Sequence, residues 1–388
     1  MKLTLAEIAQ ILSCPAPSQG SLELDGVSTD TRTLAAGNLF VALAGPRFDG
    51  HNFLPQAAQK GAAAALVSKP PAGLPQTGLP LLHVEDTLLA LGALAAAWRG
   101  RFDIPLVAVT GSVGKTTTKE MTASILSQIG PCLKTPENYN NEIGVPLTLL
   151  SLSDQYKTAV CELAMRGPGQ IRYLAEIASP TIGLITNIGV SHLELLSSQS
   201  AIAAAKAELL QAMAPNTWAL LPVESKYFPD LQKAAAHQQI LTFGPHRGRF
   251  CAENIRPQPD GLSFFLWLPA HKTGDRGDWH EISLSLPGRH HVANALAAAA
   301  AAWCAGASTQ QIIYGLEAFM TIDGRTKIHR TPAGFTVIDD TYNANPDSMK
   351  AALEVLADTP GHAKIAVLGD MKAVSYTHLR AHETVLDL

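Results

Sequence analysis

Hydrophobic residues gather into short runs that alternate with amphipathic stretches along the middle of the chain. Apolar runs lie at 104–110, 158–164, 181–189 and 217–223, and segments with helical spacing separate them. Apolar runs of this length that alternate with helices are typical of a parallel sheet with helices on both faces. We therefore predict an α/β fold for the central part of the chain.

The flanking segments have different patterns. Residues 1–103 combine strand-like and helix-like stretches, with a strand at 39–43 and a helix followed by a strand at 53–67. Residues 244–288 are rich in proline, glycine and aromatic residues, as in a short antiparallel insertion. From about 328 the order strand, loop, helix, strand returns. A chain of 388 residues is long enough for two or three domains. We predict domains at 1–103, 104–327 and 328–372, followed by a tail at 373–388.

Composition and charge narrow the class of protein. The net charge is -4 and the basic residues are scattered, whereas a nucleic-acid surface needs a basic stripe; we expect no nucleic-acid partner. Five cysteines without a Cys-x-x-Cys pair do not form a disulfide framework and favour a cytoplasmic location. The alanine-rich runs at 90–97 and 295–302 are shorter than the about 20 apolar residues of a membrane span, so we expect no membrane insertion.

A glycine-rich loop between a predicted strand and a predicted helix is the strongest local signal. Glycines let backbone N–H groups approach phosphate oxygens, and the helix N-terminus adds its dipole. In such loops the lysine pairs with phosphate groups and the following hydroxyl binds Mg²⁺. The spacing is shorter than usual, because Val109 stands where the first glycine would be. The loop consists of Gly111, Ser112, Val113, Gly114, Lys115, Thr116 and Thr117.

Three later residues stand at the ends of predicted strands or on the next helix. Glu162 ends one apolar run, His192 follows another, and Lys206 lies on an alanine-rich helix. Ligands of open α/β sheets gather at the carboxyl ends of the strands, where the phosphate loop also lies. A carboxylate and an imidazole there could hold Mg²⁺ against a phosphate. Taken singly, Glu162 and Lys206 would be interpreted as solvent-exposed side chains and His192 as a structural one.

These motifs together resemble the Mur ligase family, from about residue 20 to Met371. The matching segments are TGSVGKTTT, ITNIGVSHLELL followed by Lys206, PGRHHVANALAAAA and GRTK. The resemblance implies a three-domain architecture: an N-terminal domain that binds a uridine-diphosphate precursor, a central P-loop parallel sheet flanked by helices, and a Rossmann-like C-terminal domain. It implies an enzyme of cell-wall synthesis that uses ATP and Mg²⁺ to form an amide bond.

The resemblance also assigns roles to single residues. Lys206 would be carbamylated by CO₂, which requires a neutral amine. The metal ligands would be Thr116, Glu162, His192 and carbamylated Lys206, and the catalytic residues Lys115, Lys206, His192 and Arg325. Arg325 would contact the ATP phosphates, Asn294 the adenine and Asp340 the ribose. Without the resemblance, Asn294 would be interpreted as a cap or a surface residue.

Within the family, the chain is most similar to the member that adds D-alanyl-D-alanine to UDP-N-acetylmuramoyl-tripeptide. Three segments carry this likeness: PENYNNEIGVPLTLL, ELAMRGPGQI and DDTYNANPDSM. The precursor would be bound by Ser28, Thr29, Asp30 and Arg32 in the N-terminal domain and by Asn138, Asn140 and Asn141. Tyr342, Asn343 and Asn345 would meet ATP or the dipeptide when the domains close. We expect a monomer.

Alternative functions remain open at this stage. One is the preceding ligase, which adds the third amino acid to UDP-N-acetylmuramoyl-dipeptide, and another is a folylpolyglutamate synthase. After VLGDMK the family pattern stops, so we expect a truncated C-terminal domain and a non-native tail. An inactive precursor-binding remnant is therefore a third alternative. A GTPase-type switch would need an Asn-Lys-x-Asp motif, which the sequence does not contain.

Overall fold

The structure, a computed structural model, describes the chain except residues 47, 71–72, 191–195, 197, 271–275, 370, 372–384 and 388. The chain forms two compact units. The first comprises Met1–Ile104, Thr135–Tyr156 and Glu176–Ser179, and the second comprises Pro105–Lys134, Lys157–Ala175 and Pro180–Leu388.

The first unit is built around a four-stranded parallel sheet in the order β3-β4-β7-β8. These strands are β3 (Val27–Ser28), β4 (Leu39–Val41), β7 (Ala64–Val67) and β8 (Leu81–His83). Antiparallel pairs form between β1 (Lys2–Thr4) and β2 (Glu23–Asp25), and between β5 (Ala44–Gly45) and β6 (Phe48–Asp49). The helices are α1 (Leu5–Ile11), η1 (Gly50–Phe53), α2 (Leu54–Gln59), α3 (Thr87–Arg99) and α5 (Gly144–Leu150).

The predicted elements of this unit are confirmed. The predicted strand at 39–43 is β4, and the predicted helix and strand within 53–67 are α2 and β7. The core of the unit includes Phe40, Leu54 and Val67, none more than 1% exposed. Helix α3 begins where Asp86 Oδ1 accepts hydrogen bonds from Leu88 N and Leu89 N, as an N-cap residue does.

The second unit contains a six-stranded sheet in the order β10-β11-β9-β12-β13-β14, in which all neighbours are parallel. The strands are β9 (Leu106–Thr110), β10 (Cys132–Lys134), β11 (Thr158–Glu162), β12 (Ile182–Ile185), β13 (Trp218–Pro222) and β14 (Gln239–Phe243). The central strand β9 is buried at every position. A strand buried on both faces needs a continuous apolar run, which is the pattern on which the prediction of a parallel sheet rested.

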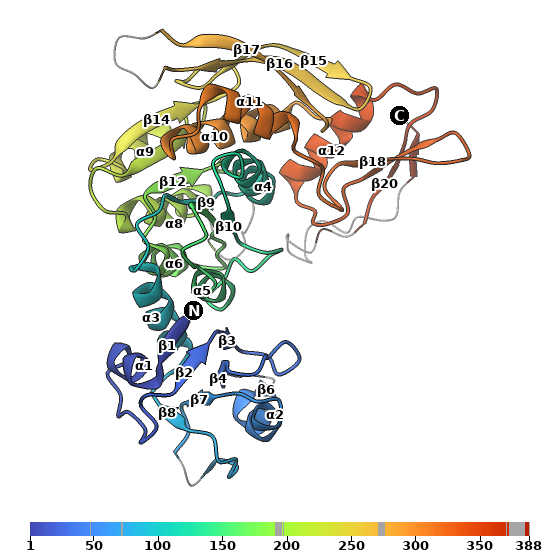
Figure 1. The fold of residues 1–388 in the computed structure, drawn as a ribbon. Coiled ribbons are helices and arrows are strands. Elements are labelled where there is room, and N and C mark those ends of the chain that lie inside the picture. The colour runs from blue at the N-terminus through green and yellow to red at the C-terminus, as the bar shows by residue number, and fades with distance from the viewer. Residues whose placement is uncertain are drawn as a thin grey trace. The chain divides into compact units, whose positions relative to one another are not determined.

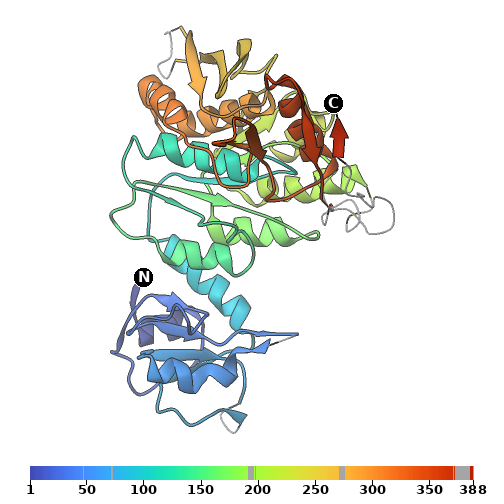
Figure 2. The ribbon, with the colours of Figure 1, turned by 90° about the vertical axis from the view of Figure 1, so that its right-hand side faces the viewer.

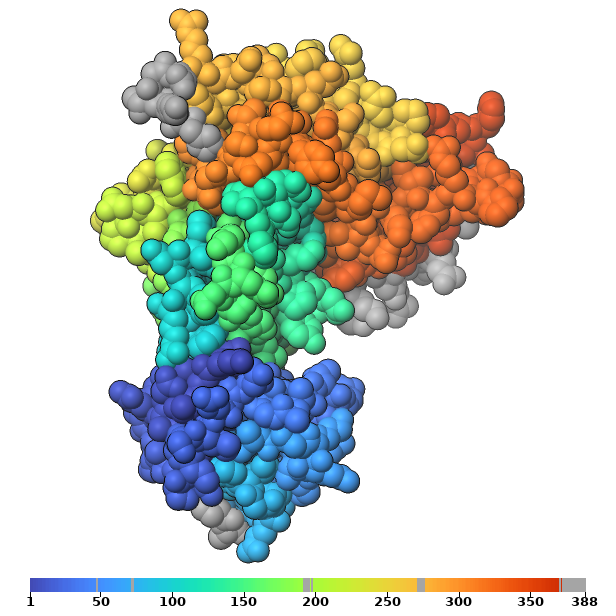
Figure 3. Space-filling model, in the orientation of Figure 1, coloured from blue at the N-terminus to red at the C-terminus, as the bar shows by residue number. Residues whose placement is uncertain are grey.

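Helices cover both faces of this sheet, as predicted. Figures 1 and 2 show α4, α10 and α11 on one face and α6 and α8 on the other. Their bounds are α4 (Lys115–Leu126), α6 (Gln170–Ala178), α8 (Gln199–Ala212), α9 (Phe228–Ala234), α10 (His290–Cys304) and α11 (Thr309–Glu317). Helix α10 carries buried alanines at 295 and 297–302. Their small side chains let α10 approach α4, and the surfaces of α4, α10 and α11 meet in Figure 3.

The segment 244–288 forms the predicted antiparallel insertion. It folds as a three-stranded sheet of β15 (Ala252–Gln258), β16 (Gly261–Leu268) and β17 (Asp278–Leu284). The apolar residues Phe264, Leu266 and Ile282 of this sheet join the same buried cluster as α4, α10 and α11. The insertion therefore covers those helices on the side away from the parallel sheet.

The last part of the chain has the predicted order of strand, loop, helix and strand. Its elements are β18 (Lys327–Arg330), β19 (Thr336–Asp339), α12 (Pro346–Asp358), β20 (Ile365–Val367) and β21 (Val385–Asp387). Strands β18 and β19 form an antiparallel hairpin, and β20 pairs with β21. Among the residues that the structure describes, no helix is both long enough and apolar enough to span a membrane.

Gly315 provides a test of the packing between α11 and α4. A Cβ at this position would lie 2.4 Å from the backbone Cα of Ile125, and Ser124 Oγ donates to the Gly315 carbonyl at 2.6 Å. We expect Gly315→Ala to lower stability by about 1–3 kcal/mol through overpacking, although alanine is the better helix former. Tyr314→Ala, at an exposed position of the same helix, should change stability by less than about 0.5 kcal/mol. Thermal unfolding measures both, and an equal or higher midpoint for Gly315→Ala would contradict the packing described.

Candidate active site

The phosphate loop leads from β9 directly into α4, as the sequence predicts. Gly111 has φ of 152° and Gly114 of 79°, values that side chains rarely tolerate. A Cβ would lie 1.9 Å from Thr186 Oγ1 at the first glycine and 2.4 Å from Asn294 Oδ1 at the second. Both positions therefore require glycine, for backbone conformation and for space.

The segment that follows β12 holds the phosphate loop in place. Thr186 Oγ1 and Asn187 Nδ2 donate to the carbonyl oxygen of Val113 at 2.7 and 3.0 Å, and Val113 N donates to Asn187 Oδ1 at 3.0 Å. Ser112 N donates to the carbonyl of Asn187, and Gly189 N donates to Ser112 Oγ at 2.9 Å. We call residues 186–189 the loop cradle. The sequence analysis assigned no role to it.

Two lysine side chains converge on one backbone oxygen of the loop. Lys115 Nζ and Lys206 Nζ both donate to the carbonyl of Gly111, at 3.0 and 2.9 Å. Lys206 is 2% exposed. Burial, followed by the charge of Lys115, holds the pKa of Lys206 well below its ordinary value, so its amine is readily neutral. Burial also lowers the pKa of Lys115, while Glu162 opposes this effect.

Glu162, Thr116 and Arg325 complete this cluster. Glu162 ends β11, next to β9 in the sheet, and is 2% exposed. Arg325 Nη2 donates to Thr116 Oγ1 at 3.0 Å, and Arg325 Nε is buried with no hydrogen-bond partner among the described residues. His192 lies outside the described residues. Within the described part of the chain, no group of three His, Cys, Asp or Glu side chains is placed to hold a metal ion.

Asn294 is buried beside the loop rather than on the surface. Thr118 Oγ1 donates to Asn294 Oδ1 at 3.3 Å, and the Asn294 amide contacts His291 Nδ1 at 3.2 Å. Burial lowers the pKa of His291 far below its ordinary value, so the ring is neutral and its Nδ1 can accept from the amide. These two contacts fix which way the amide of Asn294 points.

Asp340 and Tyr342 both lie near Arg325. Asp340 contacts the next residue, Thr326, and Tyr342 contacts the guanidinium directly. Asp340 Oδ1 accepts hydrogen bonds from Thr326 N at 2.9 Å and from Thr326 Oγ1 at 3.3 Å, and burial raises the pKa of Asp340. The guanidinium of Arg325 lies 4.1 Å from the ring centre of Tyr342, a cation–π contact.

The two asparagines near α12 differ in what they contact. Asn345 is buried, and its Oδ1 accepts from Ser348 N at 2.9 Å as the N-cap of α12. Asn343 is exposed, and its Oδ1 accepts from Ala344 N at 2.9 Å. Asn343 can reach a ligand freely, whereas Asn345 already supports the helix.

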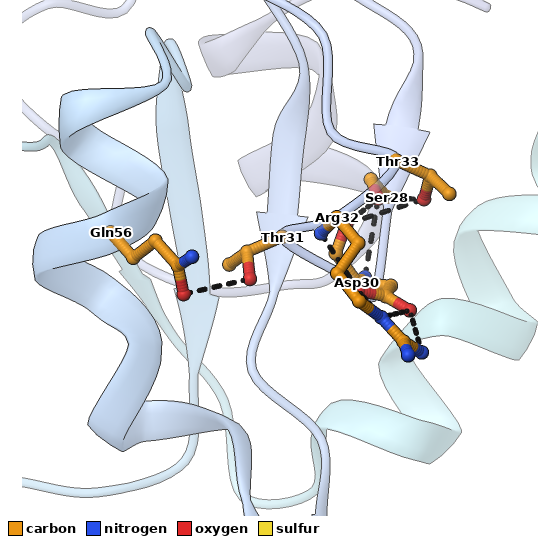
Figure 4. Close-up of polar contacts among 6 residues, drawn as sticks. All are labelled: Ser28, Asp30, Thr31, Arg32, Thr33 and Gln56. Atoms are coloured by element: carbon orange, nitrogen blue, oxygen red, sulfur yellow. Dashed lines mark hydrogen bonds and ion pairs between the residues drawn. The ribbon is translucent and has the colours of Figure 1, made fainter.

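Three of the residues predicted to bind the precursor, Ser28, Asp30 and Arg32, lie in one compact turn (Figure 4). Buried Ser28 donates from Oγ to the carbonyl of Asp30 at 2.9 Å, and Thr29 is half-buried in the same turn. Arg32 donates to both carboxylate oxygens of Asp30, with Nη2 at 2.6 Å from Oδ2. These bonds lower the pKa of Asp30. The Arg32 side chain is 86% exposed, so it remains accessible to an anion.

The asparagines at 138, 140 and 141 belong to the first unit as well. Asn141 Oδ1 accepts from Ile143 N and Gly144 N, at 3.2 and 2.9 Å, and so orders the start of α5. Asn138 is exposed and Asn140 is half-buried. The predicted precursor residues before 150 thus lie in one unit, and the predicted nucleotide residues lie in the other.

Glu208 is a buried residue near the site that sequence reasoning missed. It lies two residues after Lys206 on α8, and its carboxylate accepts from Gly169 N at 2.7 Å and Arg172 N at 3.2 Å. It thereby orders the loop that follows Glu162 and the start of α6. An acid two residues after Lys206 on an alanine-rich helix was the available signal, as the Thr-Asn pair directly after β12 was for the loop cradle.

The arrangement is suited to binding a polyanion. Lys115 and Arg325 supply positive charge at the loop, Arg325 offers a buried N–H donor, and Glu162 is the nearby buried carboxylate. Cations fixed in a partly buried site stabilise charge that develops on a transferring phosphoryl group. The site can therefore bring a nucleoside triphosphate and an anionic acceptor together.

Comparison with known families agrees with this architecture. Residues 23–99 match the Mur ligase family, catalytic domain; residues 109–302 match the Mur ligase middle domain; and residues 324–387 match the Mur ligase, glutamate ligase domain. The three matches follow one another along the chain, and the middle one covers the phosphate loop, the loop cradle and Lys206.

Individual relatives cover most of the chain. The UDP-N-acetylmuramoyl-tripeptide–D-alanyl-D-alanine ligase of Synechocystis sp. is 44% identical over 96% of this chain and 79% of its own length. A crystal structure of MurF from Acinetobacter baumannii has a TM-score of 0.87 at 35% identity, over 96% of this chain and 80% of that one. MurF ligase from Thermotoga maritima in complex with ADP has a TM-score of 0.74 at 29% identity, over 87% and 75%. The chain belongs to the Mur ligase family.

Proposed function

We propose that this protein is an ATP-dependent ligase that joins D-alanyl-D-alanine to UDP-N-acetylmuramoyl-tripeptide in peptidoglycan synthesis. The observation that carries the proposal is the convergence of Lys115 and Lys206 on Gly111, beside Glu162 and Arg325. The relative from Synechocystis sp., which is named for this reaction, supports the choice of substrates. So do the segments PENYNNEIGVPLTLL, ELAMRGPGQI and DDTYNANPDSM.

The reaction needs ATP because an amide bond between a carboxylate and an amine is uphill in water. The terminal carboxylate of the tripeptide attacks the γ-phosphorus, the bond to the β-phosphate oxygen breaks, and ADP leaves. The amine of D-alanyl-D-alanine then attacks the acyl carbon, gives up a proton, and inorganic phosphate leaves. No side chain of the protein needs to form a covalent bond. The protein instead positions two anions against each other.

Lys115 and Arg325 supply positive charge for this step. Lys115 lies in the loop that binds the phosphates, and Arg325 has a buried Nε–H without a partner among the described residues. Both donors are fixed before the substrate arrives, so they stabilise developing charge without reorganisation. Arg325 is held by Thr116 on one side and by the ring of Tyr342 on the other.

Magnesium fits the residues at this edge of the sheet. We assign its ligands to Thr116, Glu162, His192 and carbamylated Lys206, a set of hard oxygen donors with one imidazole. Glu162 is a buried carboxylate at the end of β11, next to the strand that leads into the phosphate loop. When bound, Mg²⁺ would neutralise phosphate oxygens and orient them for in-line attack. The buried, neutral amine of Lys206 is the form that reacts with CO₂.

The remaining assignments follow the geometry of each unit. We propose that Asn294 faces the adenine and Asp340 the ribose, while Tyr342, Asn343 and Asn345 meet ATP or the dipeptide on closure. We further propose that Ser28, Thr29, Asp30 and Arg32 bind the uridine diphosphate, and that Asn138, Asn140 and Asn141 line the path of the peptide. The exposed guanidinium of Arg32 is suited to the diphosphate.

The domain assignment is part of the same proposal. It places the precursor domain at 1–103, the ATP-binding domain at 104–327 and part of a C-terminal domain at 328–372, with a tail at 373–388. We propose a cytoplasmic location, since both ATP and the nucleotide-linked precursor are cytoplasmic substrates. We also propose that the protein is a monomer. That the C-terminal domain is truncated remains a prediction.

The choice of precursor tests the proposed function. Calorimetric titration with UDP-N-acetylmuramoyl-tripeptide, in the presence of Mg²⁺ and a non-hydrolysable ATP analogue, should show clear binding. UDP-N-acetylmuramoyl-dipeptide should bind at least about tenfold more weakly, a difference of about 1.4 kcal/mol. Preference for the dipeptide would assign the chain to the preceding step, and binding of neither would overturn the proposal.

The state of Lys206 is a second test. Because its pKa is lowered, the amine is neutral at pH values where an exposed lysine is charged, so a carbamate should form near pH 7. With ¹³C-labelled bicarbonate, carbon NMR should show one carbamate signal in the wild type and none in Lys206→Arg. Lys233→Arg on α9, which replaces an exposed lysine, serves as the matched control for the signal. An identical spectrum for wild type and Lys206→Arg would contradict the assignment.

A further inference from the structure

Two consecutive backbone N–H groups connect the loop cradle to different parts of the chain. Gly189 N donates to Ser112 Oγ in the phosphate loop at 2.9 Å. The next donor, Val190 N, bonds Oδ2 of Asp347 at 3.1 Å. Asp347 is the second residue of α12, more than 150 positions further along the sequence. One short segment thus touches the phosphate loop on one side and the last part of the chain on the other.

The position of this segment determines the shape of the phosphate loop. Residues 186 and 187 make three hydrogen bonds to Val113 through their side chains, and the carbonyl of Asn187 accepts from Ser112 N. A displacement at Gly189 and Val190 would be transmitted to those bonds over two or three residues. The loop's backbone donors would then no longer point to where phosphate oxygens bind.

The contact of Asp347 with the segment is close. A Cβ at Gly189 would lie 2.3 Å from Asp347 Oδ2 and 3.3 Å from Ser112 Cβ. The carboxylate therefore occupies the space that a side chain would fill at this position. A side chain at position 189 would therefore have to displace the carboxylate of Asp347.

Capping of α12 does not account for this carboxylate. Asn345 and Ser348 already form a capping box, in which Ser348 N donates to Asn345 Oδ1 and Asn345 N donates to Ser348 Oγ. An acid in the first turn is also favoured by the helix dipole, but this effect does not require contact with Val190. The second link between this part of the chain and the loop, Arg325 to Thr116 at 3.0 Å, involves different atoms.

We propose that Asp347 is a positioning residue that fixes the loop cradle and, through it, the phosphate loop. It makes no contact with the reacting atoms. Nucleotide binding by the second unit thereby depends on the seating of α12, which belongs to the last part of the chain. This inference rests on the proposed function, because it takes the phosphate loop to bind an adenine nucleotide.

Calorimetric titration of the full chain with ADP and Mg²⁺ tests the proposal. Asp347→Ala should weaken ADP binding by about five- to tenfold, less than the full contribution of a charge-assisted hydrogen bond because the contact acts on the phosphate loop indirectly. Asp347→Asn should weaken it by only about twofold, since an amide oxygen still accepts from Val190 N. Asp358→Asn, an exposed acid on the same helix, should bind ADP as the wild type does. Unchanged affinity in Asp347→Ala overturns the inference.

A double-mutant cycle separates the contact from general destabilisation. Gly189→Ala alone should weaken ADP binding, because the new Cβ collides with the carboxylate of Asp347. In the Asp347→Ala background the collision is gone, so Gly189→Ala should add little further loss; losses that multiply independently overturn the inference.

Titration with the uridine precursor reports on the first unit. Loss of precursor binding together with ADP binding in Asp347→Ala also overturns it, since the effect would then be on folding. Wild-type chain that fails to bind ADP would overturn the proposed function itself.

Discussion

The site is organised around one backbone oxygen, the carbonyl of Gly111, which accepts hydrogen bonds from two lysine side chains. Two unit charges about 4 Å apart repel by about 4 kcal/mol in a partly buried environment, so both ammonium groups cannot remain charged there without compensation. The pKa of each lysine is lowered, that of Lys206 most strongly. The amine of Lys206 is therefore readily neutral, and the positive charge of Lys115 and Arg325 near Gly111 favours the binding of anionic groups.

The α/β fold produces this convergence by placing the ends of neighbouring parallel strands at one edge. Strand β9 lies between β11 and β12, so Glu162 and the loop cradle lie on opposite sides of the phosphate loop. Helix α8 brings Lys206 from the face opposite to α4 (Figure 1). Lys115, Glu162 and Lys206 thus come from a rigid element or its immediate end, which is how a site keeps its geometry without ligand.

Much of the fold and part of the site could be predicted from the sequence. Strand burial needs apolar runs and the phosphate loop needs its glycines, so β9, β11, β12 and α4 were predicted near their observed positions. The loop cradle and Asp347 were not predicted, because their contacts depend on tertiary register. Ile185 pairs with Thr110, and this register alone places Thr186 and Asn187 opposite the phosphate loop. The Thr-Asn pair itself is visible in the sequence, but the register that places it against the loop is not. The placement of Glu208 against the start of α6 has the same origin.

The most direct test of the central claim follows the oxygen atoms of the reaction. The tripeptide precursor would be labelled with ¹⁸O in its terminal carboxylate and incubated with the protein, ATP, Mg²⁺ and D-alanyl-D-alanine. Carboxylate attack on the γ-phosphorus followed by displacement by the amine predicts one ¹⁸O atom in each released phosphate. It also predicts a precursor whose mass has grown by that of the dipeptide less one H₂¹⁸O, because one labelled oxygen leaves with the phosphate. Phosphate without ¹⁸O, or release of labelled phosphate without the extended precursor, would contradict the account.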